Sequence, residues 1–559
     1  MTEACEQSFV EDQARCEVVF AYHERTKHHF NRYARSLGYM DWANQPNPFR
    51  YYEGALQTKL DVHRQPRPLP YDRLYEKDAL PAQPLNLETL ADFFRYSLAL
   101  SAWKQYGSSR WALRINPSSG NLHPTEAYVL LPPLSGVSDA PTLCHYVSEL
   151  HALERRASLS AEVWQHLTNL LPDGSFLLGL SSILWREAWK YGERAFRYCQ
   201  HDIGHALAAL RFSAVLCGWD LQLVQGWSTV DVAMLLGLDR SDEFFAEERE
   251  EAELLCIVGP GLASQDELVF VPPAEGIRHQ IRDAAWHGRA NRLSKEHAPW
   301  PVIDEVANAT AMPKDARFAD PRNNTQSPIA HDARNVDART IISQRRSCLG
   351  LDGHSTLSLT AFLRMLWRTM PGPHAPWDAV CWRPCIHLVL FVHRVIGLQS
   401  GVYAFVRDPT KLDVLQRVMR SDFVWQSPAG VDSDCPLYLL READCHDTAR
   451  TLSCHQDIAS DGFFSLGMLA DFAEPIRRHG TWFYRNLFWE AGLIGQVLYL
   501  EAEAAGARST GIGCFFDDAV HDVLGLPDNQ FQSLYHFTVG IPVEDRRLQS
   551  LSAYPEASE

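Results

Sequence analysis

The sequence predicts an α+β protein built from two similar lobes, each a mainly antiparallel sheet flanked by helices. The main observation is an internal repeat: the pattern F-R…D-I-G…C-G…L-G-L from Phe196 to Leu238 recurs as Y-R…E-A-G…A-G…L-G-L from Tyr484 to Leu526, without a gap. Both copies then reach an apolar run of strand length, Leu254–Val258 and Tyr535–Val539, followed by glycine. Two amphipathic helices that end in glycine can resemble each other by chance, but the constant spacing favours a repeated unit.

Length and the repeat together predict the domain organisation. A chain of 559 residues is too long for one ordinary domain. A looser match extends the repeat upstream, with Leu90–Phe94 corresponding to Leu359–Leu363 and Pro124–Leu131 to Pro384–Phe391. We therefore divide the chain into an N-terminal helix and arm (1–60), a first lobe (61–284), a polar linker (285–338) and a second lobe (339–559).

Local signals predict the elements that precede the repeat. Residues 16–37 are predicted to form a helix that leads into an irregular aromatic arm, and the proline-rich stretch 62–86 is predicted to be extended. Apolar residues at helical spacing predict a helix from Leu87 to about Lys104, and a hairpin is expected near 141–150. A long helix from about Gly192 to Cys217 is expected to end at Gly218, where left-handed backbone is common.

Composition excludes several functional classes. The net charge of −17 argues against binding to nucleic acid, whose phosphates require a basic face. The N-terminus lacks the pattern of a signal peptide, and no apolar run is long enough to span a membrane, so we expect a cytoplasmic protein. The 13 cysteines include no C-x-x-C pair. The spacing Cys381…Cys385 is only weak support for zinc, and no metal site is predicted.

One loop carries most of the functional signal. The stretch Arg114–Leu131 starts with the turn-forming residues P-S-S-G-N and ends in an apolar run, Ala127–Leu131, that is predicted to be a strand. Such a loop can present hydroxyls, an amide and backbone N–H groups to a planar ligand. On residue types alone, an ordinary surface turn is the alternative interpretation.

The order of these motifs resembles a known family. A helix, a P-S-S-G-N loop that enters a strand, a long helix with Arg…acid-x-Gly, a Gly-Leu pair and a final strand resemble the FMN-dependent nitroreductase superfamily, in particular its SagB/ThcOx-type dehydrogenases. The loop from Arg114 to Tyr128 is similar to the flavin loop of that branch, and Arg197–Leu207 resembles its central helix. The resemblance covers most of 85–260 and 340–545, and it implies homodimers with FMN at the subunit interface.

The two copies have kept opposite halves of the family's motif set. The second copy has Arg345-Arg346-Ser347, which resembles the family's phosphate-binding Arg-x-Ser, and an arginine fork beside a hydroxyl suits a phosphate. At that place the first copy has Glu76-Lys-Asp78, which would repel a phosphate. Conversely, the second copy has Val380–Pro384 where the first has the flavin loop. We therefore expect an intrachain pseudo-dimer with one complete FMN site and one inactive counterpart.

The resemblance also assigns roles within the expected site. Backbone N–H groups of Gly511, Ile512 and Gly513 would face flavin N5 and favour the reduced flavin. Arg114 would approach the flavin O2/N3 edge, and Arg547 would supply a second cation toward the phosphate, with a solvated charge cluster as its alternative. The expected FMN ligands are Arg345, Arg346, Ser347, Arg114, Pro117, Ser118, Ser119, Asn121, Gly511, Ile512, Gly513 and Arg547.

Other residues have less defined roles. Arg197 and Arg485 occupy the same position in the two long helices, and an ion pair with Asp202 or Glu490 is expected at least as much as a role in the site. No catalytic side chain is predicted, because the flavin carries the chemistry in this superfamily.

The expected function is FMN-dependent oxidoreduction, with a hydride exchanged between flavin N5 and a small-molecule or peptide-heterocycle substrate. Nitro or quinone reduction with NAD(P)H as electron donor is the alternative, although no dinucleotide-binding fingerprint is present. A non-catalytic flavin-binding or scaffold protein is the alternative from another class. No nucleic-acid or membrane partner is expected, and the pseudo-dimer can associate further.

Overall fold

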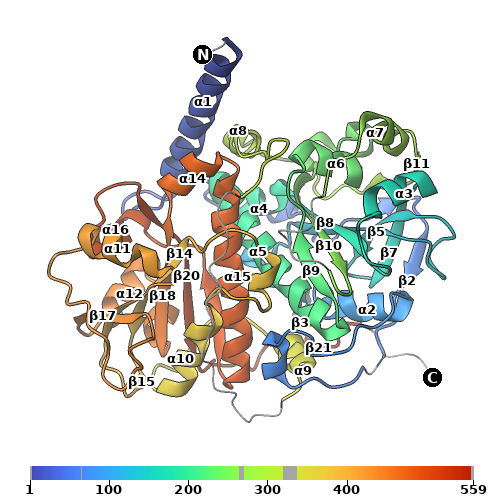
Figure 1. The fold of residues 1–559 in the computed structure, drawn as a ribbon. Coiled ribbons are helices and arrows are strands. Elements are labelled where there is room, and N and C mark those ends of the chain that lie inside the picture. Colours follow the sequence, from blue (N-terminus) through green and yellow to red (C-terminus); the bar gives the residue numbers. More distant parts are fainter. Residues whose placement is uncertain (1–2, 65, 263–269, 319–335, 555–559) are drawn as a thin grey trace.

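The computed structural model describes residues 3–64, 66–262, 270–318 and 336–554, and side chains from residue 11 onward. Two lobes lie on either side of a central pair of long helices, α5 (Ala195–Cys217) and α15 (Phe483–Ala504), which pack against each other (Figure 1). Every residue of α5 is buried, because lobe 1 covers one side of this helix and α15 covers the other. The predicted pseudo-dimer of two α+β lobes is confirmed.

Lobe 1 is built around an antiparallel sheet in the order β11-β7-β6-β5-β8-β10-β9. Its central strands are buried along their whole length, since helices cover both faces. The elements of this lobe are α2 (Leu87–Arg95), β3 (Leu100–Tyr106), β4 (Ser109–Arg114), β5 (Thr125–Leu131), β6 (Thr142–Val147), β7 (Ala152–Ser158), α3 (Ala161–Thr168), β8 (Phe176–Ser182), α4 (Leu184–Tyr191), α5, β9 (Asp220–Leu223), α6 (Thr229–Leu236), β10 (Glu251–Gly259) and α7 (Glu275–Arg282).

Lobe 2 repeats this order with the sheet β17-β16-β14-β18-β20-β19. Strand for strand, it is the lobe 1 order without the edge strand β11. The elements are α9 (Ala338–Gln344), β13 (Leu357–Ser358), α10 (Leu359–Arg368), β14 (Ile386–Val392), β15 (Val395–Ile396), β16 (Gly401–Phe405), α11 (Leu412–Val418), β17 (Leu437–Glu442), α12 (His446–Leu452), α13 (Ile458–Asp461), β18 (Phe464–Asp471), α14 (Ala473–His479), α15, β19 (Arg508–Ile512), α16 (Asp517–Leu524), β20 (Phe531–Gly540) and β21 (Gln549–Leu551).

The spacing of the repeat is preserved in the structure. Helix α6 begins at Thr229 and α16 at Asp517, and both end one residue before a left-handed glycine, Gly237 (φ 73°) or Gly525 (φ 76°). Gly218 likewise has φ 68° after α5, as predicted. Equivalent residues therefore hold equivalent positions in the two lobes.

Segments from each lobe cross to the other. Strand β21 of lobe 2 pairs with β3 of lobe 1. Arg197 of α5 donates to Asp517 of lobe 2 (2.9 Å), and its equivalent Arg485 donates to Glu253 of lobe 1 (2.6 Å). The expected pairing of these arginines with Asp202 or Glu490 is wrong, because the side chains extend across the lobe boundary to a buried acid of the opposite lobe.

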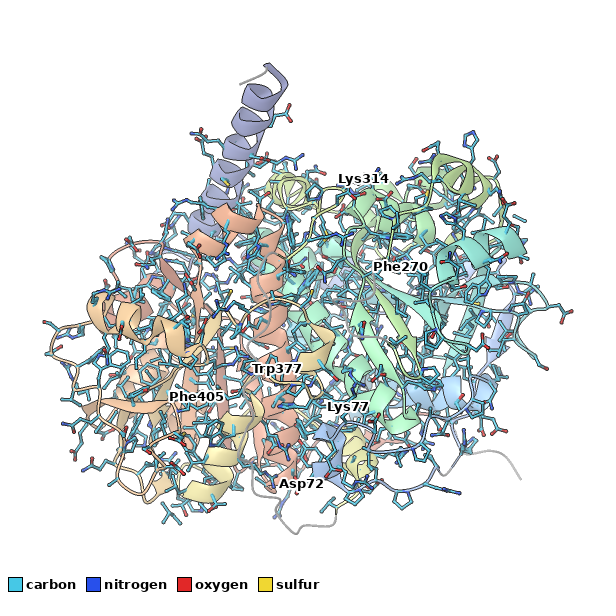
Figure 2. All side chains as sticks on the ribbon, viewed as in Figure 1. Asp72, Lys77, Phe270, Lys314, Trp377 and Phe405 are labelled. Carbon is cyan, nitrogen blue, oxygen red and sulfur yellow. The ribbon has the colours of Figure 1, made fainter. Side chains whose placement is uncertain are left out.

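The lower end of the lobe boundary is also held by charge. Asp72 lies on a short helical turn (Tyr71–Tyr75) of lobe 1 and accepts from Arg368 of α10 at 3.3 Å (Figure 2). The neighbouring Tyr71 hydroxyl donates to Glu501 of α15 at 2.9 Å. Both acids are largely buried, so these contacts fix how the lobes meet.

Two predicted helices end earlier than expected. Helix α1 (Glu3–Arg25) stops before residue 37, because Lys27 and His28 turn toward lobe 2, where Lys27 pairs with Asp518 and the His28 N–H donates to Asp517. Helix α2 stops at Arg95, because the following residues form β3 and pair with β4. In both cases tertiary contacts override local helical spacing.

The arm and the linker both contribute to lobe 1. Strand β2 (Gln57–Lys59) pairs with β7, and β1 (Tyr52–Glu53) pairs with β12 (Arg289–Ala290). Residues 285–318 of the predicted linker contain β11 (Ala285–Trp286), β12 and α8 (Pro301–Ala309), whereas residues 319–335 lie outside the described residues. Among the described helices, none combines the length and apolarity needed to cross a bilayer.

Candidate functional site

The predicted flavin loop connects β4 to β5 and faces helix α5. Asp202 of α5 accepts from the backbone N–H (3.0 Å) and the hydroxyl (3.1 Å) of Ser119. The Asn121 side chain donates to the Ala112 carbonyl at 2.9 Å, and the Ser118 hydroxyl accepts from the His123 N–H at 2.8 Å. These bonds fix the P-S-S-G-N turn against the long helix. Pro117 is buried within it.

Arg345 of lobe 2 contacts the start of this loop directly. Its guanidinium donates to the carbonyl oxygens of Ile115 and Arg114, both at 3.0 Å, and it lies over the Tyr499 ring at 4.9 Å. The Arg345 side chain is buried. The predicted clamp and the predicted loop, some 230 residues apart in sequence, therefore meet at the lobe boundary.

Tyr499 connects Arg345 to the segment Gly511–Gly513, which we call the glycine edge. Its hydroxyl lies 2.8 Å from the Ser347 hydroxyl and accepts from the Gly511 N–H at 3.1 Å. An added Cβ at Gly511 would overlap the Tyr535 hydroxyl, so only glycine fits at this position. Ile512, which lies between Gly511 and Gly513 in the sequence, is the last residue of strand β19 and is buried.

Helix α5 meets the other end of the glycine edge. The Tyr198 hydroxyl donates to the Gly513 carbonyl at 3.0 Å, and an added Cβ at Gly513 would overlap the Tyr198 ring. Tyr198 lies edge-on to Tyr191 at 4.5 Å, and the Tyr191 hydroxyl would lie 2.5 Å from a Cβ added at Gly120. Loop, tyrosines, glycine edge and Arg345 thus form one cluster that spans both lobes.

Among the described residues, a few buried polar atoms of this cluster have no hydrogen-bond partner. His201 stacks on Tyr535 with ring centres 4.1 Å apart, and His205 contacts the Tyr535 hydroxyl at 3.3 Å. His205 also hydrogen-bonds to the Gln496 side chain, and His201 to the Leu534 backbone. Buried polar groups without partners are uncommon and often indicate a ligand or water. Arg114 Nε and Asn116 Oδ1 are two such atoms.

Burial dominates the electrostatics of the cluster. It raises the pKa of Asp202 to about 7, although the bonds from Ser118 and Ser119 act in the opposite direction. Burial, followed by the charge of Arg345, lowers the pKa of His205 to about 3, so this ring is neutral. Burial also lowers the pKa of Arg114 to about 10. The cluster therefore holds neutral histidines beside a carboxyl that titrates near neutrality.

The remaining predicted ligands are less central. Arg114 donates to the Pro48 carbonyl at 2.7 Å, and Arg346 donates to the Ser101 carbonyl at 3.0 Å. Arg547 is exposed, pairs with Asp545 at 2.8 Å and lies over the Tyr106 ring at 5.7 Å. No described contact joins Arg547 to the rest of the cluster.

The counterpart position in lobe 2 is built differently. Glu490, the equivalent of Asp202, accepts from the N–H groups of Cys385 (3.0 Å) and Ile386 (3.2 Å) and pairs with buried Arg407. Glu76, which the sequence predicts at the counterpart of the clamp, is paired with Arg73 at 3.0 Å.

The predicted linker fills this counterpart position. The Gly226 N–H, which lies in the segment after β9, donates to the Ala316 carbonyl at 3.0 Å. The ring of Phe318 then lies between the lobes, with its centre 5.2 Å from Trp382, 5.0 Å from Trp482 and 6.0 Å from Phe483. An aromatic side chain of the chain itself thus packs against the segment that replaces the flavin loop.

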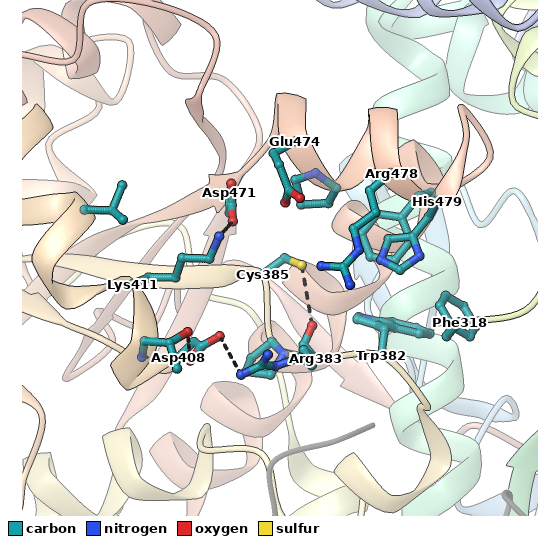
Figure 3. Close-up of a pocket in the computed structure, with 15 residues that line it drawn as sticks. Phe318, Trp382, Arg383, Cys385, Asp408, Lys411, Asp471, Glu474, Arg478 and His479 are labelled. Carbon is teal, nitrogen blue, oxygen red and sulfur yellow. Dashed lines mark hydrogen bonds and ion pairs between the residues drawn. The ribbon is translucent and has the colours of Figure 1, made fainter. Parts of the chain in front are cut away.

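A pocket of about 280 Å³ opens beside Phe318 (Figure 3). Trp382, Cys385 and His479 are among the residues that line it. Lys411 pairs with Asp471 at one side of the pocket, and Arg383 lies 3.8 Å from Asp408. Its charges are therefore largely compensated by one another.

A group with metal-ligand potential lies elsewhere, near the N-terminal arm. Glu24, His29 and Asp518 bring one ligand atom each into the same region. The Lys27 ammonium lies 2.8 Å from both acids, so a cation already occupies this place and the group supports no metal site.

Comparisons with known proteins agree with this architecture. Residues 440–541 match the profile of the nitroreductase family. A protein of Anabaena variabilis assigned as a nitroreductase superposes with a TM-score of 0.67 over 94% of this chain and 99% of its own, at 22% sequence identity. The fold is that of a nitroreductase. Because the match covers almost all of this chain, it extends across both lobes.

Other solved structures match a smaller part of the chain. A protein of Ralstonia eutropha assigned as a nitroreductase is 14% identical and covers 41% of this chain and 98% of its own, with a TM-score of 0.27. The E. coli microcin synthetase McbBCD complex with truncated pro-MccB17 bound is 16% identical, covers 40% and 79%, and has a TM-score of 0.27. No curated protein matches the chain.

Sequence reasoning missed the side chains that line the cluster. Tyr198, His201 and His205 lie on one face of α5. Three polar aromatic residues on one face of a mostly apolar helix could have indicated a functional role from the sequence. Tyr499 and Tyr535 could not be found in this way, because their role depends on the approach of β19 and β20 to the opposite lobe. No sequence pattern indicated a role for Phe318, which stands in the polar linker.

Proposed function

We propose that the chain is an FMN-dependent oxidoreductase with one flavin site between its lobes. The observation that carries this proposal is the pair of hydrogen bonds from Arg345 of lobe 2 to the Ile115 and Arg114 carbonyls of lobe 1. They bring the retained phosphate clamp and the retained flavin loop together. We also propose that the two lobes arose by duplication, as their shared strand order supports.

The residues present fit FMN at the lobe boundary. Arg345 and Arg346 are cations beside the exposed Ser347, which suits a phosphate near the surface. The unpartnered Asn116 Oδ1 offers an acceptor that a donor group of a polar heterocycle can satisfy. The Gly511 N–H is bonded to the Tyr499 hydroxyl, so binding at this edge requires Tyr499 to release it.

FMN, when bound, supplies hydride exchange at its N5 atom. The chain's own residues would bind the flavin, orient it and shield it from water. The Arg345 guanidinium would hold the phosphate end, and the P-S-S-G-N loop would hold the ring system. Asp202, whose pKa burial raises to about 7, can keep or release a proton behind the loop near neutral pH. Tyr198 and Tyr535 limit access of water from the glycine edge.

The substrate class follows from the family resemblance. A SagB/ThcOx-like dehydrogenase would oxidise azoline-type peptide heterocycles or similar small molecules. The alternative of the same class is nitro or quinone reduction with NAD(P)H, and that of another class is a non-catalytic flavin-binding or scaffold protein. The compensated charges and the Phe318 plug at the counterpart position support one FMN per chain.

The decisive experiment is the absorption spectrum of the purified chain with flavin quantified per polypeptide. We expect about one FMN per chain, bound directly or taken up from solution. Protein that stays colourless after incubation with FMN would refute the proposal that the chain is an FMN-dependent oxidoreductase. Two flavins per chain would refute the single composite site, and flavin without turnover of any heterocycle, nitro or quinone substrate would favour the scaffold alternative.

A further inference from the structure

Two cysteines from distant parts of lobe 2 meet beside the glycine edge. The Sγ atoms of Cys454 and Cys514 lie 2.7 Å apart, although 60 residues separate them in sequence. Cys514 directly follows Gly513, and Cys454 lies in the turn between α12 and α13. Of the 12 cysteines in the described side chains, nine are buried, whereas these two and Cys16 are half-exposed. The pair is therefore accessible to small reagents.

The backbone around the pair is held in place. Cys454 (φ 55°) and His455 (φ 59°) both have left-handed backbone, which is costly for non-glycine residues and often marks a functional turn. The Gln456 amide donates to the Ser453 carbonyl at 2.8 Å and to the Cys514 carbonyl at 3.1 Å, and the Phe516 N–H donates to the Leu452 carbonyl at 2.9 Å. These bonds clamp the two cysteine segments together.

The N-terminal arm supplies an imidazole to the pair. His28 hydrogen-bonds to Cys514. Its Nδ1 accepts from the Ala34 N–H at 2.9 Å, so the neutral ring carries its proton on Nε2 and can donate to a thiolate. The His28 N–H donates to Asp517 at 2.9 Å, which fixes the arm at this place. Arg194 lies over the Phe515 ring at 4.9 Å and adds a positive charge nearby.

We propose that Cys454 and Cys514 form a redox-active dithiol that closes to a disulfide by exchange with small-molecule disulfides. Cys514 attacks a disulfide RSSR and forms a mixed disulfide, releasing RS⁻. Cys454 then attacks the Cys514 sulfur, the Cys454–Cys514 bond forms, and the second RS⁻ leaves. The Cys454 proton and one proton from solvent go to the two released thiolates, so the protein is oxidised by two electrons and RSSR is reduced to two RSH.

The two cysteines have different roles in this exchange. The contact with Cys454 and the hydrogen bond from His28 lower the pKa of Cys514 to about 5, while the pKa of Cys454 is raised. Cys514 is therefore a thiolate at neutral pH and the attacking group, and Cys454 is the resolving thiol. Among the described residues, the other ionisable groups that face the pair are Tyr33 of the arm, Tyr191 of α4, Arg194 and Tyr198 at the start of α5, and Asp517 of α16.

The pair is independent of the flavin proposal, because the co-reactant is a soluble disulfide. The test uses the full chain, reduced, desalted and incubated with oxidised glutathione, followed by alkylation and peptide mass spectrometry without reductant. We expect two thiols lost per chain and one linked peptide pair that contains Cys454 and Cys514. Both cysteines recovered alkylated, or Cys514 left glutathionylated in the unmodified chain, would overturn the proposal.

Three variants sharpen this test. Cys454→Ser should stop at a glutathione adduct on Cys514, and Cys514→Ser should give neither product. Cys16→Ser is the matched control, because Cys16 is half-exposed and burial raises its pKa, and it should behave as the unmodified chain.

The pH dependence of alkylation separates a thiolate from an ordinary exposed thiol. Between pH 6.5 and 7.5 the iodoacetamide labelling rate of Cys514 should stay nearly constant, whereas that of Cys16 should rise about tenfold, as its thiolate fraction does. In His28→Ala the Cys514 rate should become pH-dependent in the same range. A Cys514 rate that rises in parallel with that of Cys16 would overturn the assigned roles.

Discussion

Gly204 and Gly492 occupy equivalent positions in the two lobes and contact each other where the long helices cross. A Cβ atom on Gly492 would lie 2.8 Å from the Cα atom of Gly204, and a Cβ on Gly204 would overlap the backbone of Trp489. The opposing atoms are main chain and cannot rotate away. The close approach of α5 and α15, and thus the lobe boundary with its polar cluster, depends on two residues without side chains.

Gly204→Val should therefore separate the lobes or prevent their assembly. Overpacking at a fixed helix crossing costs about 1–3 kcal/mol or more, so we expect a clear fall in the midpoint of thermal unfolding. Gly276→Ala in α7 is the control, since nothing lies within 4 Å of its added Cβ. That control should be neutral or slightly stabilising. Equal stability of the Gly204 and Gly276 variants would show that the crossing tolerates a side chain.

Arg345→Ala and Asn121→Ala should both weaken FMN binding, although they lie in different lobes. We propose that Arg345 donates a charged hydrogen bond to the FMN phosphate, and the loss of such a bond costs roughly 1.5–3 kcal/mol, or about ten- to hundredfold in Kd. Flavin fluorescence titration measures the effect. Glu76→Gln, at the counterpart position, is the control and should bind FMN as the unmodified chain does.

A loss of binding in only one of these two variants would contradict a shared site. Thermal unfolding of each apo variant must accompany the titration, because Arg345 also joins the lobes. A variant that unfolds at the same temperature but binds FMN weakly locates the effect in the site.

The sequence predicted the α+β fold of two similar lobes, because this depends on the spacing of apolar residues and glycines along the chain. It failed where distant segments decide local structure. Helix α2 ends at Arg95 because β4 pairs with the residues that follow. The partners of Arg197 and Arg485 lie across the lobe boundary, and no local pattern encodes them. The same holds for Phe318, whose position depends on both lobes.

Asp202 should make stability depend on pH. Burial raises its pKa from 3.8 to about 7 in the folded state, so the folded chain binds the proton more tightly than the unfolded chain. The resulting stabilisation is full below pH 3.8 and is lost as the pH rises to about 7, by up to about 4 kcal/mol. Burial, followed by the charge of Asp202, raises the pKa of nearby Glu187 well above its usual value.

Asp202→Asn removes this charge and keeps a polar group beside Ser119. Urea unfolding at several pH values should show a smaller fall in stability between pH 4 and 7 than in the unmodified chain. If both proteins lose the same free energy of unfolding over that range, Asp202 does not carry the raised pKa.

Phe318→Ala tests why one position binds no flavin. The ring packs against Trp382 and Trp482, so its removal from this half-buried place should cost about 1–3 kcal/mol of stability, measured by urea unfolding. Flavin content should nevertheless stay at one per chain, because removal of the plug supplies no cation for a phosphate: the sequence predicts Glu76 at the counterpart of Arg345. A rise toward two flavins per chain would mean that the linker alone blocks a second, otherwise competent site.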